Sequence, residues 1–207
     1  MLVVVDYGSG NLRSVVQALE TVAGEGLDVR ISNDSEDVLA ASHIILPGVG
    51  SFGDCVRGLR AVPGMVSALE TAVLKKKKKF LGICVGMQML FDEGHEHGRH
   101  KGLGWLEGEV ALLKPTAPDI KVPHMGWNEL HISVSHPLLH GIKNGDHAYF
   151  VHSYHARCRT GSDVIAYTDY GRAVTAVVAR GNIMGTQFHP EKSQRTGLKI
   201  LKNFVSL

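Results

Sequence analysis

The sequence predicts an α/β fold of the doubly wound, flavodoxin-like kind. Its central sheet is expected to be mostly parallel, with helices on both faces and an antiparallel extension in the C-terminal half. Short β-branched runs alternate with helical patterns in the first half, which is typical of parallel βαβ units. From about Trp105, strand-like segments follow one another between turn residues. No internal repeat and no long polar linker divides the 207 residues, so we expect a single domain over residues 1–207.

The first half opens with a strand, a glycine turn and a helix. Leu2–Asp6 is the apolar strand, and Asn11–Ala23 repeats apolar residues at helical spacing with Asn11 as the N-cap. Because cations are favourable at a helix C-terminus, the run Lys75–Lys79 is interpreted as a solvated helix end. The other elements expected in this half are the strands Leu27–Ile31, His43–Leu46 and Phe80–Cys84 and the helices Ser35–Ala41, Asp54–Leu59, Met65–Leu74 and Val85–Asp92.

The second half is expected to contain mostly strands and to close with a helix. His152 and His155 lie three residues apart in one of these strands, so their side chains point to opposite faces and at most one can face a site. The expected elements are the strands Trp105–Leu113, Tyr149–Cys158, Val164–Asp169, Val174–Arg180 and Ile183–Phe188 and the helix Gln194–Val205.

Composition and charge exclude several classes of partner. The 22 Lys and Arg against 20 Asp and Glu give a net charge of +2, too small to indicate a nucleic-acid partner or a membrane surface. The start at Met1 carries no basic residues and reaches Asp6 after a short apolar run, so it lacks the form of a secretory signal. The three cysteines are far apart, which suits a reducing compartment. We therefore expect a cytoplasmic protein without a membrane partner.

No cofactor and no metal are predicted. Gly8-Ser9-Gly10 begins like a dinucleotide fingerprint, but Arg13 stands where the third glycine belongs, and there is no Walker motif. His95, His97 and His100 crowd a polar segment without a cysteine or carboxylate frame of zinc spacing. A solvated loop is the better interpretation of that segment.

The sharpest chemical feature is Gly82-Ile83-Cys84-Val85-Gly86, where a strand ends in cysteine and turns at once into a helix. This segment has the form of a nucleophile elbow with sulfur in place of oxygen, and side chains at the two glycines would clash. The free N–H groups and positive dipole end of the following helix lower the pKa of a thiol and stabilise an oxyanion. Cys84 is therefore the predicted nucleophile, and the alternative is an ordinary buried cysteine.

A thiol nucleophile needs a base, and His189-Pro190-Glu191 follows a predicted strand. Side chains two residues apart in an extended chain point the same way, so Glu191 can orient the His189 imidazole. Together with Cys84 this pair predicts a Cys-His-Glu triad, because nucleophile, base and orienting group occur together.

Pro47-Gly48-Val49-Gly50 follows another predicted parallel strand, at the end of the sheet where doubly wound folds bind ligands. Its glycines let backbone N–H groups turn toward a substrate oxygen. With the N–H of Val85, an amide of Val49 or Gly50 would form an oxyanion hole. The alternative is a plain turn.

These segments together resemble the class I (triad) glutamine amidotransferases. Among them, the chain is similar almost from end to end to the glutaminase subunits of imidazole glycerol phosphate synthase, an enzyme of histidine biosynthesis. The segments that carry this closer resemblance are Asp6–Ser14, Pro47–Gly53, Pro123–Asn128, Tyr149–Tyr154 and Gln187–Ser193.

The resemblance implies that Cys84 attacks the carboxamide of L-glutamine and forms a glutamyl thioester. It implies that amides of Val85 and of the Val49–Gly50 segment hold the oxyanion, and that His189 protonates ammonia and then activates water. Gly94 stands where relatives often have serine, two residues before the acid that matches Glu96. The residues implied to hold glutamine are Gly86, Gln88, Glu96, Ser153 and Tyr154.

The resemblance also implies a heterodimer with a (β/α)₈-barrel cyclase subunit. That partner receives ammonia and joins it to a phosphorylated ribulosyl intermediate, which yields imidazole glycerol phosphate and an aminoimidazole carboxamide ribotide. The glutaminase is expected to be nearly silent until the cyclase binds its substrate, through a rearrangement of the Pro47–Gly50 strand. The residues implied at the partner interface are Asn11, His124, Met125, Trp127, Asn128 and Lys192.

Two other classes of function remain open at this point. A glutaminase of pyridoxal phosphate or anthranilate synthesis would share the triad, although the segments HMGWN and DYGSGNLRS argue against both. A non-catalytic interaction subunit, or a related cysteine hydrolase or chaperone, could also use the same fold. Retention of Cys84, His189 and Glu191 together argues against a subunit without activity.

Overall fold

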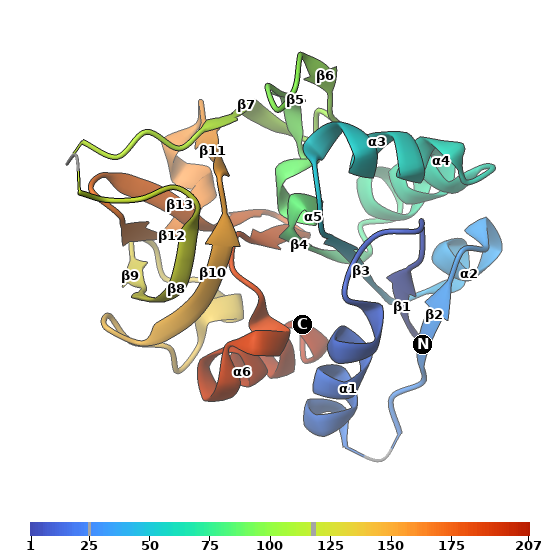
Figure 1. Cartoon of the computed structure of the whole chain (residues 1–207). Coiled ribbons are helices and arrows are strands. Elements are labelled where there is room, and N and C mark those ends of the chain that lie inside the picture. The colour runs from blue at the N-terminus through green and yellow to red at the C-terminus, as the bar shows by residue number, and fades with distance from the viewer. Residues whose placement is uncertain (25, 117–118) are drawn as a thin grey trace.

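A computed structural model describes residues 1–24, 26–116 and 119–207. Within these residues the largest sheet has eight strands in the order β2-β1-β3-β4-β14-β13-β12-β9 (Figure 1). Neighbouring strands from β2 to β14 pair in parallel, whereas β13, β12 and β9 continue the sheet antiparallel. The predicted architecture, a mostly parallel sheet with an antiparallel extension in the C-terminal half, is confirmed.

The strands of the described residues form one large sheet and two smaller ones. The large sheet contains β1 (Leu2–Val5), β2 (Val29–Ser32), β3 (His43–Gly48), β4 (Lys79–Cys84), β9 (His131–Ile132), β12 (Val164–Asp169), β13 (Ala173–Arg180) and β14 (Ile183–Thr186). The second sheet pairs β8 (His124–Glu129) with β10 (His147–His152). The third has the order β11 (Tyr154–Cys158), β7 (Leu106–Leu112), β5 (Phe91–Gly94) and β6 (His100–Lys101).

Helices cover both faces of the parallel strands, as predicted. α1 (Leu12–Ala23) packs against α6 (Gln194–Val205) on one side, and α3 (Phe52–Ala61) and α4 (Met65–Leu69) lie on the other (Figure 1). No helix in the described ranges has the length and apolar character needed to cross a membrane. The remaining helical elements are α2 (Ser35–Ala40), α5 (Val85–Gln88), the π-helical turn η1 (Glu70–Lys75) and the 3₁₀ turns η2 (Pro137–Leu139), η3 (Gly161–Asp163) and η4 (Pro190–Lys192).

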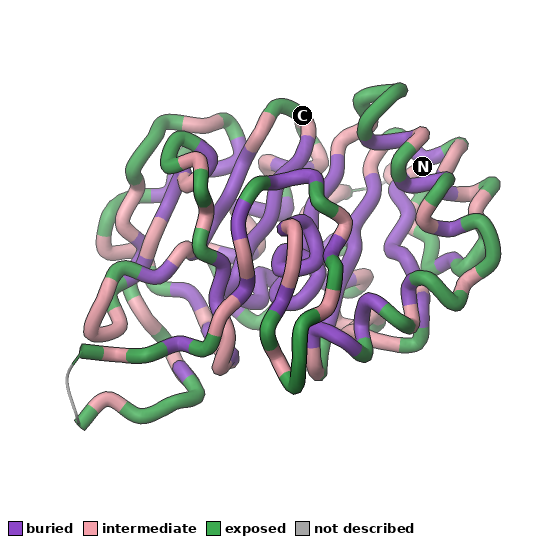
Figure 2. Tube along the Cα trace, turned by 90° about the horizontal axis from the view of Figure 1, so that it is seen from above, coloured by how far each residue is buried: buried purple, intermediate pink, exposed green. Residues whose placement is uncertain are grey.

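The core lies between the sheet and its covering helices. Every residue of β1 is buried, as expected for a central parallel strand, and Figure 2 shows burial concentrated in the central strands. Val15 and Leu19 of α1 and Ile200 and Phe204 of α6 are fully buried at helical spacing. Burial of a side chain of this size contributes about 1.5–3 kcal/mol, so this packing holds the strand ends that carry the site.

The helix predicted over Val85–Asp92 is too long, because α5 ends at Gln88 and β5 follows soon after. The Leu90 carbonyl accepts hydrogen bonds from the N–H groups of Trp105 and Leu106, at 2.8 and 2.9 Å. A distant segment therefore pairs with the chain just after α5, where strand β5 begins, and helical spacing does not reveal such a partner.

The single strand predicted over Tyr149–Cys158 is two strands, β10 and β11. They are separated at Ser153, and they pair with β8 and β7 respectively. The Ser153 carbonyl accepts a hydrogen bond from the Leu113 N–H at 2.8 Å where the chain changes sheets. Strand β8, which contains the HMGWN segment, is also absent from the prediction.

Two local predictions concern helix ends. Asn11 lies at the N-cap of α1 as predicted, but its side chain makes no capping hydrogen bond. Lys75, Lys76 and Lys77 are exposed at the end of η1, so the interpretation of this part of the run as a solvated helix end is confirmed.

Candidate active site

A cavity of about 450 Å³ opens at the carboxyl ends of β3 and β4, where doubly wound sheets bind their ligands. Its walls come from both halves of the chain. The structure brings together here most of the residues predicted for the nucleophile, the oxyanion hole and substrate binding. The lining residues are Val49, Gly50, Cys84, Val85, Gln88, Glu96, Pro123, Val151, His152, Ser153, Tyr154, His189 and Lys192.

Cys84 stands at a strained turn between β4 and α5. Its φ is 54°, in the left-handed region that residues other than glycine seldom adopt. A Cβ at Gly86 would lie 1.8 Å from the Leu46 carbonyl oxygen, and one at Gly82 would lie 2.5 Å from the Gly86 carbonyl oxygen. Close packing therefore requires both glycines around the strained cysteine, as a nucleophile elbow demands.

His189 and Glu191 form a buried pair next to Cys84. Nδ1 of His189 lies 2.8 Å from Oε1 of Glu191, and the two meet through the turn η4 rather than along an extended chain as the sequence suggests. Burial lowers the pKa of His189, but hydrogen bonds and charges of the Cys84 thiolate and Glu191 outweigh this and raise it to about 10. An imidazole whose pKa is raised in this way is suited to hold a proton next to a nucleophilic sulfur and to give it to a leaving group.

The other two cysteines lie in different surroundings. Burial raises the pKa of the Cys55 thiol, and it raises that of Cys158 to about 11. Both are neutral thiols at physiological pH. Cys55 lies 3.4 Å from the Ser9 hydroxyl and 3.4 Å from the Val49 carbonyl oxygen, where its sulfur packs beneath the Pro47–Gly50 loop.

The two predicted oxyanion donors differ in their present bonding. Val85 is the first residue of α5, so its N–H has no partner within the helix and is offered next to Cys84. The Val49 N–H instead donates to Ser9 Oγ at 3.2 Å, while the Ser9 hydroxyl donates to the Val49 carbonyl at 2.6 Å. Gly50 lines the cavity together with Val49. Ser9 therefore engages both the N–H and the carbonyl of Val49, so this N–H is not free to bind an oxyanion.

Four of the five residues predicted to hold glutamine line the cavity: Gln88, Glu96, Ser153 and Tyr154. The Gln88 amide donates to the Tyr154 carbonyl at 2.9 Å, which joins α5 to the far wall of the cavity. The fifth, Gly86, lies beneath the cavity against the Leu46 carbonyl and is not a lining residue.

The departure at Gly94 has a packing reason. A Cβ at this position would lie 2.5 Å from the Phe52 ring. The Glu96 carboxylate accepts a hydrogen bond from the Phe52 N–H at 2.8 Å, so Gly94 and Glu96 both contact the start of α3. One carboxylate oxygen of Glu96 is thus committed to the protein.

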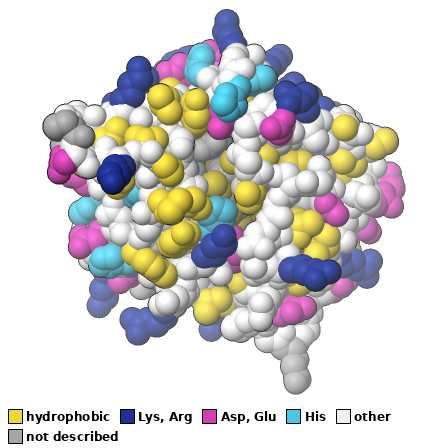
Figure 3. All heavy atoms as spheres, viewed as in Figure 1, with side chains coloured by type: hydrophobic (Ala, Val, Ile, Leu, Met, Phe, Trp, Pro, Cys, Tyr) yellow, Lys and Arg dark blue, Asp and Glu magenta, His cyan; other side chains and the backbone are white. Residues whose placement is uncertain are grey.

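The residues predicted at the partner interface do not all lie at the surface. Met125 and Trp127 are 61% and 47% exposed, and with the exposed Val122 they form an apolar patch over β8 and β10 (Figure 3). Lys192 is exposed, and Asn11 and Asn128 are partly exposed. His124, in contrast, is buried.

The His124 ring is 1% exposed and stacks against Phe150 and Tyr170, with ring centroids 4.6 and 3.9 Å apart. In this chain the ring therefore lies beneath the exposed side chains of β8, and its place at the interface stays a prediction. Alternation along β8 accounts for the difference, because neighbouring residues of a strand face opposite sides.

Sequence reasoning did not assign Pro123, Val151 and His152 to the site, although all three line the cavity. The rings of His152 and His124 share a hydrogen bond of 3.0 Å. Burial lowers the pKa of His152 to about 3 and that of His124 to about 4, so both rings are neutral. Of His152 and His155, only His152 lines the cavity, in agreement with the expectation that at most one faces a site.

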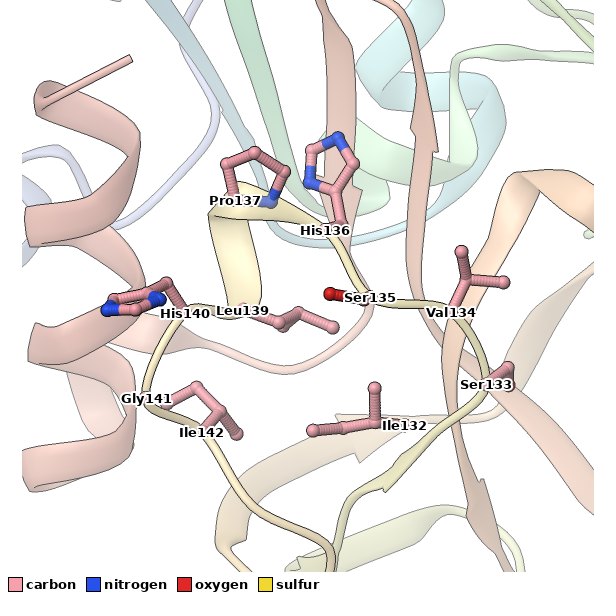
Figure 4. A pocket seen from close by; sticks show the side chains of 10 residues that line it. All are labelled: Ile132, Ser133, Val134, Ser135, His136, Pro137, Leu139, His140, Gly141 and Ile142. Carbon is pink, nitrogen blue, oxygen red and sulfur yellow. The ribbon is translucent and has the colours of Figure 1, made fainter.

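A second cavity of about 560 Å³ lies in the segment between β9 and β10. Figure 4 shows Ile132 and Ile142 pointing toward each other across it, whereas His136 and His140 point in different directions. None of the residues predicted for catalysis lines this cavity. The chemistry therefore belongs to the smaller cavity around Cys84.

Glu93, His95 and Glu109 place possible metal-ligand atoms within 4.8 Å of one another in the described part of the chain. Glu93 pairs with Arg99 at 2.6 Å, and Glu109 pairs with Arg157 at 3.3 Å. Because the arginines already compensate the carboxylates, and because the group lies outside the Cys84 cavity, we interpret it as a surface ion-pair network.

Comparison with known proteins agrees with this geometry. The family "Glutamine amidotransferase class-I" matches residues 3–207. The imidazole glycerol phosphate synthase subunits HisH of Rhodospirillum rubrum and Brucella suis are each 51% identical to this chain, over 97% and 98% of it and 96% of each relative.

Solved structures share the fold at lower identity. A crystal structure of a glutamine amidotransferase superposes with a TM-score of 0.73 at 19% identity and covers 99% of this chain and 97% of that one. PurLQS from Thermotoga maritima superposes with a TM-score of 0.70 at 23% identity, with coverage of 99% and 97%.

Proposed function

Since the chain belongs to the class-I glutamine amidotransferases, and within them to the HisH subunits of imidazole glycerol phosphate synthase, we propose that it hydrolyses L-glutamine at Cys84 and delivers the ammonia to a barrel cyclase subunit. The observation that carries this proposal is the His189–Glu191 pair beside the strained Cys84 in one cavity. The 51% identity to HisH subunits favours this acceptor over pyridoxal phosphate or anthranilate synthesis.

The hydrolysis runs through a thioester. The Cys84 thiolate attacks the carboxamide carbon of glutamine, and the carbonyl oxygen takes up the negative charge. His189 gives its proton to the departing nitrogen, ammonia leaves, and a glutamyl thioester remains. His189, oriented by Glu191, then takes a proton from water, whose oxygen attacks the thioester. Glutamate and the thiolate are released.

The oxyanion hole is completed only when Val49 moves. The Val85 N–H supplies the first donor, because it has no partner within α5. The second donor is the Val49 or Gly50 amide, and the Val49 peptide must first leave its hydrogen bonds with Ser9. This requirement makes the isolated chain slow and gives a cyclase with bound nucleotide a means of accelerating it, through the Pro47–Gly50 strand.

Glutamine is held by groups on both walls of the cavity. Glu96 offers its second carboxylate oxygen to the substrate's ammonium group, since the first accepts from Phe52. Both amide hydrogens of Gln88 are engaged within the protein, so its Oε1 is the atom left to accept a hydrogen bond. Ser153 and Tyr154 contact glutamine from the opposite wall of the cavity. Gly86 acts indirectly, because its lack of a side chain allows the close packing of the turn at Cys84.

The partner would dock over the apolar patch of Val122, Met125 and Trp127. Exposed tryptophan and methionine are enriched in interface cores, and Pro123 links this patch directly to the cavity wall. Lys192 lies on the same rim. A cyclase seated there covers the cavity mouth and receives ammonia before it reaches solvent, for the synthesis of imidazole glycerol phosphate and aminoimidazole carboxamide ribotide.

Glutamate production by the chain alone, with the cyclase, and with the cyclase and its nucleotide tests this proposal. We expect slow turnover alone and roughly 100-fold acceleration in the complete mixture, near the upper end of ordinary coupling energies. Full turnover by the isolated chain would contradict control by the partner. Absence of glutamate in every mixture would contradict glutamine hydrolysis itself.

A further inference from the structure

Gln187 lies beside the nucleophile without lining the cavity. Its side chain is completely buried, and its Nε2 donates to Cys84 Sγ at 3.7 Å. The backbone N–H of Gln187 donates to the Ala176 carbonyl at 2.8 Å, which fixes the segment just before His189. This amide has no role in the hydrolysis steps assigned to Cys84 and His189, although it contacts the reacting sulfur from within the protein.

The direction of the Gln187 amide is set by a chain of hydrogen bonds. The Tyr154 carbonyl can only accept, so it takes a proton from Gln88 Nε2 at 2.9 Å. The second hydrogen of that nitrogen points to Gln187 Oε1 at 3.0 Å. Because Oε1 of Gln187 accepts, the Nε2 on the other side of the same amide must present its hydrogen to the sulfur.

We propose that Gln187 is a further catalytic residue, whose amide stabilises the Cys84 thiolate, and that Gln88 is the positioning residue that orients this amide. This inference rests on the proposed role of Cys84 as the nucleophile. A neutral amide donates a hydrogen bond but does not accept the thiol proton, so the negative charge stays on the sulfur. It therefore raises the fraction of thiolate, and it stabilises the sulfur again when the thioester breaks and the thiolate leaves.

The chain of amides also accounts for the burial of two polar side chains. Gln88 is 2% exposed and Gln187 is 0% exposed, and buried polar groups are costly unless they are hydrogen-bonded. A core of this kind needs no glutamine for packing, because an apolar residue of similar length would fill the same volume. The need for a hydrogen-bond donor at the Cys84 sulfur gives a chemical reason for a glutamine at position 187.

Gln187→Met tests the proposal, since it keeps the length of the side chain and removes the donor. The rate at which iodoacetamide alkylates Cys84 is measured against pH on the full chain without glutamine, with peptide mass spectrometry to separate Cys84 from Cys55 and Cys158. Loss of a hydrogen bond to a charged group should raise the apparent pKa of alkylation by about one unit and lower the thiolate fraction at neutral pH roughly 10-fold. The kcat for glutamine should fall by a similar factor, while KM changes less than about twofold.

Thr186→Val is the matched control. It removes a buried hydrogen bond at the residue next to Gln187, from Thr186 Oγ1 to the Phe188 carbonyl at 3.1 Å, and leaves the donor to the sulfur in place. We expect it to alkylate at Cys84 as the unaltered chain does. Gln88→Met should shift the alkylation profile in the same direction as Gln187→Met, but by less. If Gln187→Met does not fold, Gln88→Met tests the same row of hydrogen bonds at the residue that orients Gln187.

An unchanged alkylation profile in folded Gln187→Met overturns the proposal, and so does an equal shift in Thr186→Val. If only Gln88→Met folds, an unchanged profile in that variant overturns it as well. Failure of the wider function looks different, because glutamine hydrolysis would then survive in Cys84→Ala. Unaltered thiol reactivity in Gln187→Met together with Cys84-dependent turnover rejects the role of Gln187 alone.

Discussion

The parallel half of the molecule and its antiparallel half contribute to the site in different ways. In the parallel half, the backbone positions the chemistry: Cys84 is strained between β4 and α5, and Gly82 and Gly86 are packed to contact distance with their neighbours. The antiparallel half contributes side chains to the walls, among them Ser153 and Tyr154, and presents an exposed apolar patch.

The two halves should therefore differ in how well they tolerate substitutions. A site set by backbone contacts has no side chain that can move aside, so substitutions there should disrupt the fold or abolish the reaction. Substitutions in a cavity wall or a docking surface built from side chains should have graded effects, on binding affinity or on the pH dependence of stability.

Cys84→Ala should have the largest effect. Loss of the nucleophile removes the covalent step, so glutamate production should fall roughly 10⁴-fold or more. Cys158→Ala is the matched control in the antiparallel half, because its partly buried thiol has a pKa raised to about 11 and no assigned role. Glutamate production that survives in Cys84→Ala would contradict the role of Cys84 as the nucleophile.

Gly86→Ala should come next, through stability. The new Cβ would lie 1.8 Å from the Leu46 carbonyl oxygen, so β3 and α5 must separate, and the free energy of unfolding should fall by roughly 3 kcal/mol or more. Gly161→Ala in the antiparallel half adds a Cβ with nothing within 4 Å and should change it by less than about 0.5 kcal/mol. Urea unfolding measures both, and similar losses in the two variants would refute the packing argument.

Trp127→Ala should weaken cyclase binding while leaving the fold intact. Truncation of a central aromatic residue in an interface costs about 2 kcal/mol, or roughly 30-fold in Kd. Ile31→Ala is a suitable control, because Ile31 is similarly exposed but lies on β2, at the far edge of the large sheet. Titration calorimetry against the cyclase measures both affinities. Equal Kd values for Trp127→Ala and the unaltered chain would place the interface elsewhere.

His155→Leu should show the smallest effect, and only in acid. Burial, with the charges of Arg157 and Arg172, lowers the pKa of His155 to about 4, and neither ring nitrogen has a hydrogen-bond partner in the described structure. Below about pH 6.5 the imidazole therefore binds a proton in the unfolded chain but not in the folded chain. The free energy of unfolding consequently falls as the pH decreases from 6.5 toward 4.

Relative to the unaltered chain, the leucine variant should gain up to about 2 kcal/mol on going from pH 7.5 to pH 5. Urea unfolding at the two pH values measures this gain. A difference between the two proteins that does not depend on pH would contradict the buried neutral state of the ring.

Elements of the parallel half could be predicted because their signals are local. Apolar runs between glycine turns predict β1, β3 and β4, and the glycines around Cys84 predict the elbow that the structure contains. The closing helix Gln194–Val205 is also observed with the predicted bounds, since its apolar residues recur at helical spacing.

The remainder depends on contacts between distant parts of the chain. Pairing with Leu106 ends α5 early, and the change of sheet at Ser153 divides a segment that the sequence predicts as one strand. The hold of Ser9 on Val49 joins residues 40 positions apart, and the contact of Gln187 with Cys84 joins residues 103 apart. No local pattern encodes such contacts. The type of chemistry could therefore be predicted from the sequence, but the hydrogen bonds that position the reacting groups could not.

The central claim is that Cys84 carries the glutamyl group during turnover. Acid quenching of the chain with its cyclase, nucleotide and glutamine, followed by mass spectrometry of the intact protein and its peptides, observes this intermediate directly. We predict a mass increase of one glutamyl group on the peptide that contains Cys84, and none in Cys84→Ala. Continuing turnover with no adduct on Cys84, or an adduct on Cys55 or Cys158 instead, would contradict the account.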